Sequence, residues 1–140
     1  MFGEVKPILI DTDVIINHLR GQVQETAFLK RIMIEEEFQG LYSAVTEVEL
    51  FAAEKVNEAQ VNDIKSILDN LKRIELTSAI AQMAGNFLGR FRKSHSLEMP
   101  DAIIGASVLI CNASLATVNT RHYSFIPGLL LTSPAAFFPG

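Results

Sequence analysis

The sequence contains a single cysteine, Cys111. A lone thiol cannot form an internal disulfide, so we expect a protein of a reducing compartment rather than a disulfide-stabilised secreted domain. Cys111 ends an apolar run, and no histidine is evidently paired with it. We therefore interpret Cys111 as a small buried hydrophobe and not as a nucleophile.

Long apolar segments are also missing. The first apolar run, residues 7–10, ends at Asp11 and is too short and too acidic for a signal peptide. The longest, residues 102–111, is roughly half a membrane span and contains Gly105 and Ser107. We expect no membrane segment and a soluble, cytoplasmic protein.

The sequence also lacks an excess of positive charge. The net charge is −4 and the isoelectric point is near 5.3. Nucleic-acid-binding proteins usually carry a basic face, so any such function must depend on a local site here. The 140 residues are 49% hydrophobic and 20% charged, which predicts one domain with a substantial core.

Strand-like and helix-like segments alternate along the chain. Short apolar runs predict strands at residues 6–10, 41–45, 73–76 and 115–118, with an edge strand at 129–131. Helices are expected over residues 12–20, 22–37, 46–55, 57–71, 78–95 and 100–111, with Gly21 and Gly40 as helix stops. Alternating strands and helices predict a three-layer α/β/α domain over residues 1–140, with a mainly parallel sheet of four to five strands.

The segment 78–95 has the clearest helical periodicity. Its apolar residues form one stripe: Ile80, Met83, Ala84, Phe87, Leu88 and Phe91. This stripe predicts a face that is buried in the core or in a dimer interface.

Acidic residues follow the predicted strands. Functional groups of open α/β sheets gather beyond the carboxyl ends of the strands. Asp11 and Asp13 come directly after the first strand, Glu49 lies shortly after the second, and Asp101 opens the apolar helix. The fourth strand leads to Asn119.

Each acid also has a structural interpretation. Asp13 suits the first turn of a helix, where the helix dipole favours negative charge. Thr46 and Glu49 fit a capping box with Thr46 as the N-cap. Asp101 follows a proline and suits a first turn as well. Asp11 fits least, because an acid that ends a buried strand gains nothing from a dipole and loses hydration.

Taken together, the acids predict a metal site. Two carboxylates about 4 Å apart repel each other by roughly 4 kcal/mol at an effective dielectric constant of 20, so several at one edge need a cation or a proton. Oxygen ligands without a cysteine or histidine cluster favour Mg²⁺ or Mn²⁺. Hydrolysis of a phosphodiester is the chemistry that most needs such an ion.

The order of these motifs resembles that of PIN-domain ribonucleases, specifically the VapC-type toxins of toxin–antitoxin pairs. The matching stretches are residues 8–16 (ILIDTDVII), 43–50 (SAVTEVEL), 100–106 (PDAIIGA), 115–123 (LATVNTRHY) and 126–129 (IPGL). They span nearly the whole chain, and they stand in the order and at the spacing of the family.

The resemblance implies roles for individual residues. Asp11, Glu49 and Asp101 correspond to the acidic triad that holds Mg²⁺ or Mn²⁺ and positions the attacking water. Asn119 fits the polar position of the fourth motif, and Asp13 is left with an indirect role. Glu47 lies in the second motif but is expected to face elsewhere.

One position departs from the family. Many members have a fourth acid where this chain has His122, which weakens the case for a second metal ion. Contact with a phosphate and no role at all are both open interpretations of His122.

The resemblance also implies partners: an RNA substrate, a second copy of the chain in a homodimer, and a cognate antitoxin that inserts into the acidic groove. Several cations lie in one part of the sequence: Arg90, Arg92, Lys93, His95 and Arg121. They suit contact with RNA phosphates, and the cluster before Pro100 equally suits a solvated helix end.

Two other classes of enzyme fit less well. Asp11 and Asp13 resemble the first motif of haloacid-dehalogenase-type phosphatases, but such enzymes need a later lysine and a late acidic pair. No lysine follows Lys93, and no acid follows Asp101. A receiver domain lacks its late lysine for the same reason. The non-enzymatic alternative is a PIN-like domain that only binds RNA or a protein.

Overall fold

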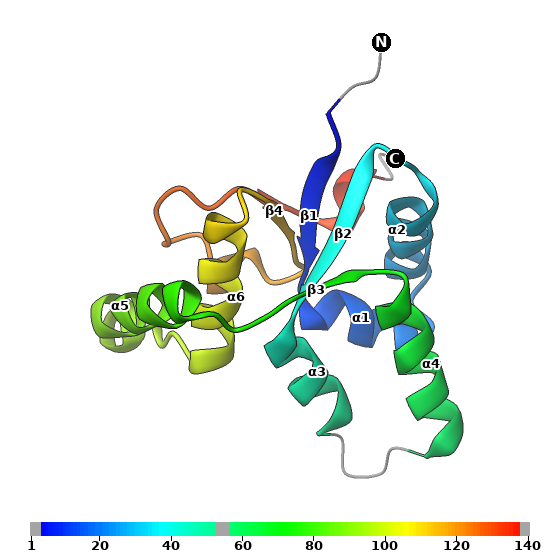
Figure 1. The fold of residues 1–140 in the computed structure, drawn as a ribbon, viewed down its shortest axis with the longest axis horizontal. Helices are drawn as coiled ribbons and strands as arrows, with labels where there is room; N and C mark the ends of the chain where they lie inside the picture. Colours follow the sequence, from blue (N-terminus) through cyan, green and yellow to red (C-terminus); the bar gives the residue numbers. More distant parts are fainter. Residues whose placement is uncertain (1–3, 53–56, 138–140) are drawn as a thin grey trace.

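Five parallel strands form the centre of the protein in a computed structural model, which describes residues 4–52 and 57–137 (Figure 1). Their order across the sheet is β3-β2-β1-β4-β5, and every neighbouring pair is parallel. The strands are β1 (Lys6–Ile10), β2 (Phe38–Ser43), β3 (Lys72–Ile74), β4 (Ser114–Ala116) and β5 (Leu131–Thr132). The predicted parallel sheet is confirmed.

Helices cover both faces of this sheet. In Figure 1, α1 (Thr12–Leu19), α2 (Val23–Ile34) and α4 (Glu58–Asp69) lie on one side, and α5 (Ser78–His95) and α6 (Met99–Ile110) lie on the other. The eight-residue α3 (Ala44–Phe51) follows β2, and two short 3-10 helices follow later in the chain: η1 (Thr120–His122) and η2 (Pro134–Phe137). The three-layer α/β/α architecture is therefore confirmed.

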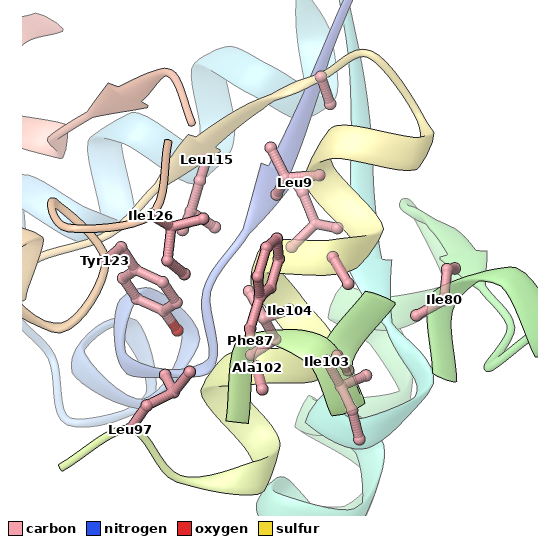
Figure 2. Close-up of a cluster of buried hydrophobic side chains, with 14 of the residues drawn as sticks. Leu9, Ile80, Phe87, Leu97, Ala102, Ile103, Ile104, Leu115, Tyr123 and Ile126 are labelled. Atoms are coloured by element: carbon pink, nitrogen blue, oxygen red, sulfur yellow. The ribbon is translucent and has the colours of Figure 1, made fainter. Parts of the chain in front are cut away.

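The sheet divides the buried apolar residues into two clusters. Successive side chains of a strand point to opposite faces. Leu9 accordingly packs with α5 and α6, as Figure 2 shows, whereas Ile8 and Ile10 pack with α1, α2 and α4. Every strand residue from Ile8 to Ile10 is thus buried, which explains the continuous apolar run in β1.

Two helices confirm their sequence patterns. On α5, Ile80, Ala84 and Phe87 are buried against the cluster that contains α6, so the stripe is a core face. On α6, residues 102–108 are all buried, which explains why that helix is apolar around its circumference. Among the described helices, none has both the length and the apolarity needed to cross a membrane.

Gly40 was predicted to stop a helix, and that prediction is wrong. Helix α2 ends at Ile34, and Gly40 lies inside β2. A Cβ atom on Gly40 would stand 2.5 Å from Leu71 Cδ2 and 3.0 Å from Ile32 Cγ2. The glycine therefore permits close packing of β2 against Ile32 of α2 and against Leu71, which lies between α4 and β3. A sequence pattern does not distinguish such a glycine from one that ends a helix.

Thr46 does not cap a helix. Helix α3 begins two residues earlier, at Ala44, and its N-cap is Ser43, whose Oγ accepts a hydrogen bond from Val45 N at 3.2 Å. The predicted end of this helix, at residue 55, lies outside the described residues. The later strands are also displaced from their predicted bounds by one to two residues: β3, β4 and β5.

The strand order places a switch point at β1. The chain leaves β1 towards β2 on one side, and β4 pairs with β1 on the other side. In open parallel sheets, the crevice at such a point, beyond the carboxyl ends of the strands, is where functional groups collect. Asp11 follows β1 directly, and its backbone N–H donates to Ala116 O in β4 at 2.9 Å.

Candidate active site

Asp11 lies at the centre of the strand-end crevice and is 6% exposed. It is the N-cap of α1, and its Oδ1 accepts a hydrogen bond from Thr12 N at 2.8 Å. Its Oδ2 accepts a hydrogen bond from Thr117 Oγ1, at 2.8 Å, from the end of β4. Helix α1 and strand β4 thus hold the Asp11 carboxyl group between them.

Asp13 shares a partner with Asp11. Its Oδ2 lies 3.2 Å from the same Thr117 hydroxyl and accepts a second hydrogen bond, at 2.8 Å, from Asn119 Nδ2. Its Oδ1 is buried and has no hydrogen-bond partner among the described residues. A single hydroxyl hydrogen cannot serve both carboxyl groups fully, so this pair is left short of donors.

Glu49 reaches the site from α3 through two threonines. Thr12 Oγ1 donates to Glu49 Oε1 at 2.7 Å and lies 2.9 Å from Thr46 Oγ1. Thr46 is fully buried, whereas Glu49 is exposed. The interpretation of Glu49 as a capping residue is therefore wrong: its side chain is directed to the start of α1.

Asp101, in the first turn of α6, has a partner on each oxygen. Tyr123 donates its phenolic hydrogen to Asp101 Oδ1 at 3.0 Å, and His122 Nδ1 lies 3.7 Å from Oδ2. Tyr123 is completely buried, and Figure 2 shows its ring beside α6, on the same side as Leu97. His122 therefore contacts one of the predicted ligands.

The three aspartates of this crevice have pKa values above the ordinary value for aspartate. Burial, followed by the charge of neighbouring Asp13, raises the pKa of Asp11 from 3.8 to about 7, and Asp101 adds to the rise. Burial also raises the pKa of Asp13 and of Asp101. The pKa of the Tyr123 hydroxyl is raised as well, by burial and by the charges of Asp11 and Asp101. The shared Thr117 hydroxyl brings Asp11 and Asp13 together, and the charge of Asp101 contributes to the rise in the pKa of Asp11.

The donor set suits a hard divalent cation that keeps part of its water. All the candidate ligands are carboxylate oxygens, and the buried Asp13 Oδ1 lacks a partner among the described residues. Within residues 4–52 and 57–137, however, no three side chains of the types Asp, Glu, His or Cys are close enough together to enclose an ion. Mg²⁺ commonly binds through one or two carboxylates plus waters, so direct and water-mediated contacts together fit this arrangement.

Glu47, only two residues from Glu49, belongs to a different network. Its Oε1 accepts hydrogen bonds from Tyr42 Oη at 3.0 Å and from Arg73 Nη1 at 2.9 Å. These bonds, led by the one from Arg73, lower the pKa of Glu47. The expectation that Glu47 faces away from Glu49's contacts agrees with this geometry.

The hydroxyl groups that arrange the acids are absent from the sequence-based prediction of the site. Thr12, Thr117 and Tyr123 donate side-chain hydroxyl hydrogen bonds to Glu49, Asp11 and Asp101, respectively, and Thr46 contacts the Thr12 hydroxyl. A signal was present: Thr12 adjoins Asp11, and Thr117 ends a predicted strand just before Asn119.

Comparisons with known proteins agree with this arrangement. A family model of the PIN domain matches residues 8–125. The chain is 29% identical over 122 residues to ribonuclease VapC19 of Mycobacterium tuberculosis, covering 86% of this chain and 95% of that relative. It is 30% identical over 117 residues to ribonuclease VapC10 of the same organism, covering 83% and 85%.

A solved structure shows the same fold. The chain matches a component of a toxin–antitoxin complex from Klebsiella pneumoniae with a TM-score of 0.70 and 26% identity, covering 91% of this chain and 97% of that one. These matches leave no support for the phosphatase and receiver interpretations. Since the family match spans residues 8–125 and includes each acid of the strand-end crevice, this chain belongs to the PIN-domain family and is a homologue of the VapC ribonucleases.

Proposed function

We propose that this protein is a divalent-metal-dependent endoribonuclease that hydrolyses RNA phosphodiester bonds as the toxin of a VapBC-type module. The observation that carries the proposal is the state of Asp11, a buried carboxyl group whose pKa is raised to about 7 beside Asp13 and Asp101. Such a group is poorly stabilised by the protein alone and is well suited to a cation. The relatives VapC19 and VapC10, both named ribonucleases, support the assignment.

In this proposal, Asp11, Glu49 and Asp101 hold Mg²⁺ or Mn²⁺, directly or through water. When bound, such an ion stabilises charge on the phosphoryl group and lowers the pKa of a coordinated water. Thr12 fixes the direction of Glu49, and the Tyr123 hydroxyl fixes Asp101. These contacts set ligand geometry before any substrate arrives, which reduces the reorganisation needed during reaction.

Asn119 and Asp13 form a second part of the proposed site. Asn119 Nδ2 donates to Asp13 Oδ2, so the amide faces the acids at the end of β4. We assign Asn119 to the catalytic machinery as a polar group that contacts the water or the substrate phosphate. Asp13 holds Asn119 and adds negative charge near Asp11.

Cleavage of structured RNAs with and without Mn²⁺ tests this function. We expect the wild type to cut only with the metal, and Asp11→Asn and Asp101→Asn to lose most of that activity. Glu47→Gln is the matched control, because Glu47 is an acid of the same helix as Glu49 but is bound to Tyr42 and Arg73. Equal cleavage by the wild type and both aspartate variants would contradict the enzymatic assignment.

The proposed partners are a cognate antitoxin, a second copy of the chain and a cytoplasmic RNA. The matched Klebsiella pneumoniae structure is a toxin–antitoxin complex, which supports an antitoxin for this chain. Expression of the wild type alone is expected to arrest growth, and Asp11→Asn is expected to abolish the arrest. A neighbouring reading frame for a small basic DNA-binding protein would support the module.

A PIN-like domain without catalysis is the second candidate function. It is favoured by the fact that no three candidate ligands enclose a common point within the described residues. RNA binding without Mn²⁺-dependent cleavage in the experiment above would establish this alternative.

A further inference from the structure

A pocket of about 290 Å³ opens beside Asp101 and its partner His122. It is lined by His95 at the end of α5, by residues 96–98, which join α5 to α6, and by Asp101, Arg121 and His122. Its volume lies near the lower end of the range for ligand pockets, so it suits one small unit of a substrate. Because Asp101 is a proposed metal ligand, an occupant of this pocket would adjoin the reacting phosphate.

The His95 ring stands on an aromatic base at one side of this pocket. It stacks on Phe125 with ring centres 4.2 Å apart and an angle of 20° between the planes. Phe91 contacts both rings, with its centre 5.7 Å from that of His95 and 5.0 Å from that of Phe125. His95 is nevertheless exposed. A ring that stacks on one aromatic neighbour and is still exposed suits the stacking of an unpaired base.

One arginine lines the same pocket, and three more cations lie on the helix that leads into it. Arg121 lines it, and the last turns of α5 add Arg90, Arg92 and Lys93. None of these four has a carboxylate within 4 Å in the described structure, whereas Arg73 is tied to two glutamates. A chain with a net charge of −4 needs such a local group of available cations to hold a phosphate backbone.

We propose that this pocket binds the nucleotide next to the scissile phosphate in a single-stranded segment of the RNA. The base stacks on His95, and its phosphate contacts Arg121, with His122 between that phosphate and Asp101. Glu98, also in the lining, offers an acceptor for a 2′-hydroxyl or an exocyclic amine. The inference rests on the proposed function and adds to it where the substrate strand lies and which side chains hold it.

The test measures binding of a fluorescein-labelled, single-stranded decaribonucleotide of random sequence to the full chain, in EDTA so that no cleavage occurs. His95→Ala is expected to weaken binding about five- to a hundredfold, the range for loss of one base stack. His95→Phe keeps a flat ring and is expected to restore most of the affinity. If His95 had only a structural role, both variants would lose affinity equally because their folding had changed. Thermal melts of each variant detect such a change.

Arg121→Gln is examined through salt dependence. Loss of one phosphate contact on a single strand should reduce the slope of log Kd against log [KCl] by about 0.7. The control is Arg20→Gln, an exposed arginine at the C-cap of α1 and outside the pocket, which should leave the slope unchanged. An unchanged affinity for His95→Ala, an unchanged slope for Arg121→Gln, or no binding of RNA by the wild type would overturn the proposal.

These outcomes are separable from failure of the nuclease assignment. Mn²⁺-dependent cleavage by the wild type, together with unaltered RNA binding by both pocket variants, would support the ribonuclease assignment and contradict the proposed role of the pocket. No cleavage, together with binding that depends on His95 and Arg121, would leave the RNA pocket standing and remove the enzyme.

Discussion

Replacing Asp11 with asparagine should stabilise the metal-free protein at neutral and alkaline pH. The side chain is 6% exposed, and its pKa rises from 3.8 to about 7 on folding. The folded state therefore retains a proton that the unfolded chain releases. Stability contributed by this group falls as the pH rises from about 4 to about 7 and is constant above that window.

The size of the effect follows from the pKa. One pKa unit corresponds to 1.36 kcal/mol, so ionised Asp11 destabilises the fold by about 4 kcal/mol above pH 7. Asparagine removes this cost, keeps an oxygen for the Thr12 N–H and weakens the hydrogen bond from Thr117. We expect a net gain of about 2 kcal/mol at pH 8, or roughly 8 °C in Tm for a domain of this size.

Urea denaturation in EDTA at pH 5, 6, 7 and 8 measures this gain. At pH 5 the folded wild type already holds the proton, so the two proteins should differ little. With Mn²⁺ at about 100 times its Kd, the wild type should gain about 2.7 kcal/mol, and Asp11→Asn should gain much less. A variant that is less stable than the wild type at pH 8 in EDTA, or a difference independent of pH, would refute the reasoning and make Asp11 a structural residue.

Three further predictions concern the surroundings of the site. Gly40→Ala should lower the free energy of unfolding by about 1–3 kcal/mol in urea denaturation, because the added Cβ would meet Leu71 Cδ2 at 2.5 Å. An unchanged free energy of unfolding would contradict the packing argument. Thr46→Val should lower the free energy of unfolding by about 1 kcal/mol and weaken the affinity for Mn²⁺ measured by calorimetry, since the Thr12 hydroxyl loses a partner. An unchanged affinity would show that Thr46 does not position Thr12 for metal binding. Glu47→Gln should lower stability by less than 1 kcal/mol at pH 7, and this loss should shrink as the pH falls below 4.5, the ordinary pKa of a glutamate, because a lowered pKa adds stability above that value and the contribution disappears as the folded protein takes up the proton. Altered Mn²⁺ binding would disqualify the variant as a control.

Local patterns predicted the elements that are specified by neighbouring residues. The strand Lys6–Ile10 and the helix Ser78–His95 have the predicted bounds. Both carry an unbroken signal, a continuous apolar run in one and a 3.6-residue stripe in the other. The extent of the domain, residues 1–140, stays a prediction, as do the roles of Asp11, Glu49, Asp101 and Asn119.

The same patterns gave wrong predictions where the structural role of a residue depends on a partner distant in the sequence. Gly40 and Thr46 both looked like helix boundaries, and both are instead buried or close-packed positions within elements. A glycine that makes room for Leu71 and a glycine that ends a helix look alike in a sequence. The packing that distinguishes them arises between segments about 30 residues apart.

By itself, the sequence determined that acids end the strands of a parallel sheet, because strand boundaries and the convergence of parallel strand ends follow from local pattern and topology. Only the tertiary structure decided which groups meet there. Thr12 and Glu49 are 37 residues apart, and Asp11 and Thr117 are 106 apart. Their contacts depend on strand register and helix packing. The same packing buries Asp11 near Asp13 and Asp101, which raises the pKa of Asp11 although the hydrogen bond from Thr117 lowers it, and it lets Thr12 direct Glu49 towards the site.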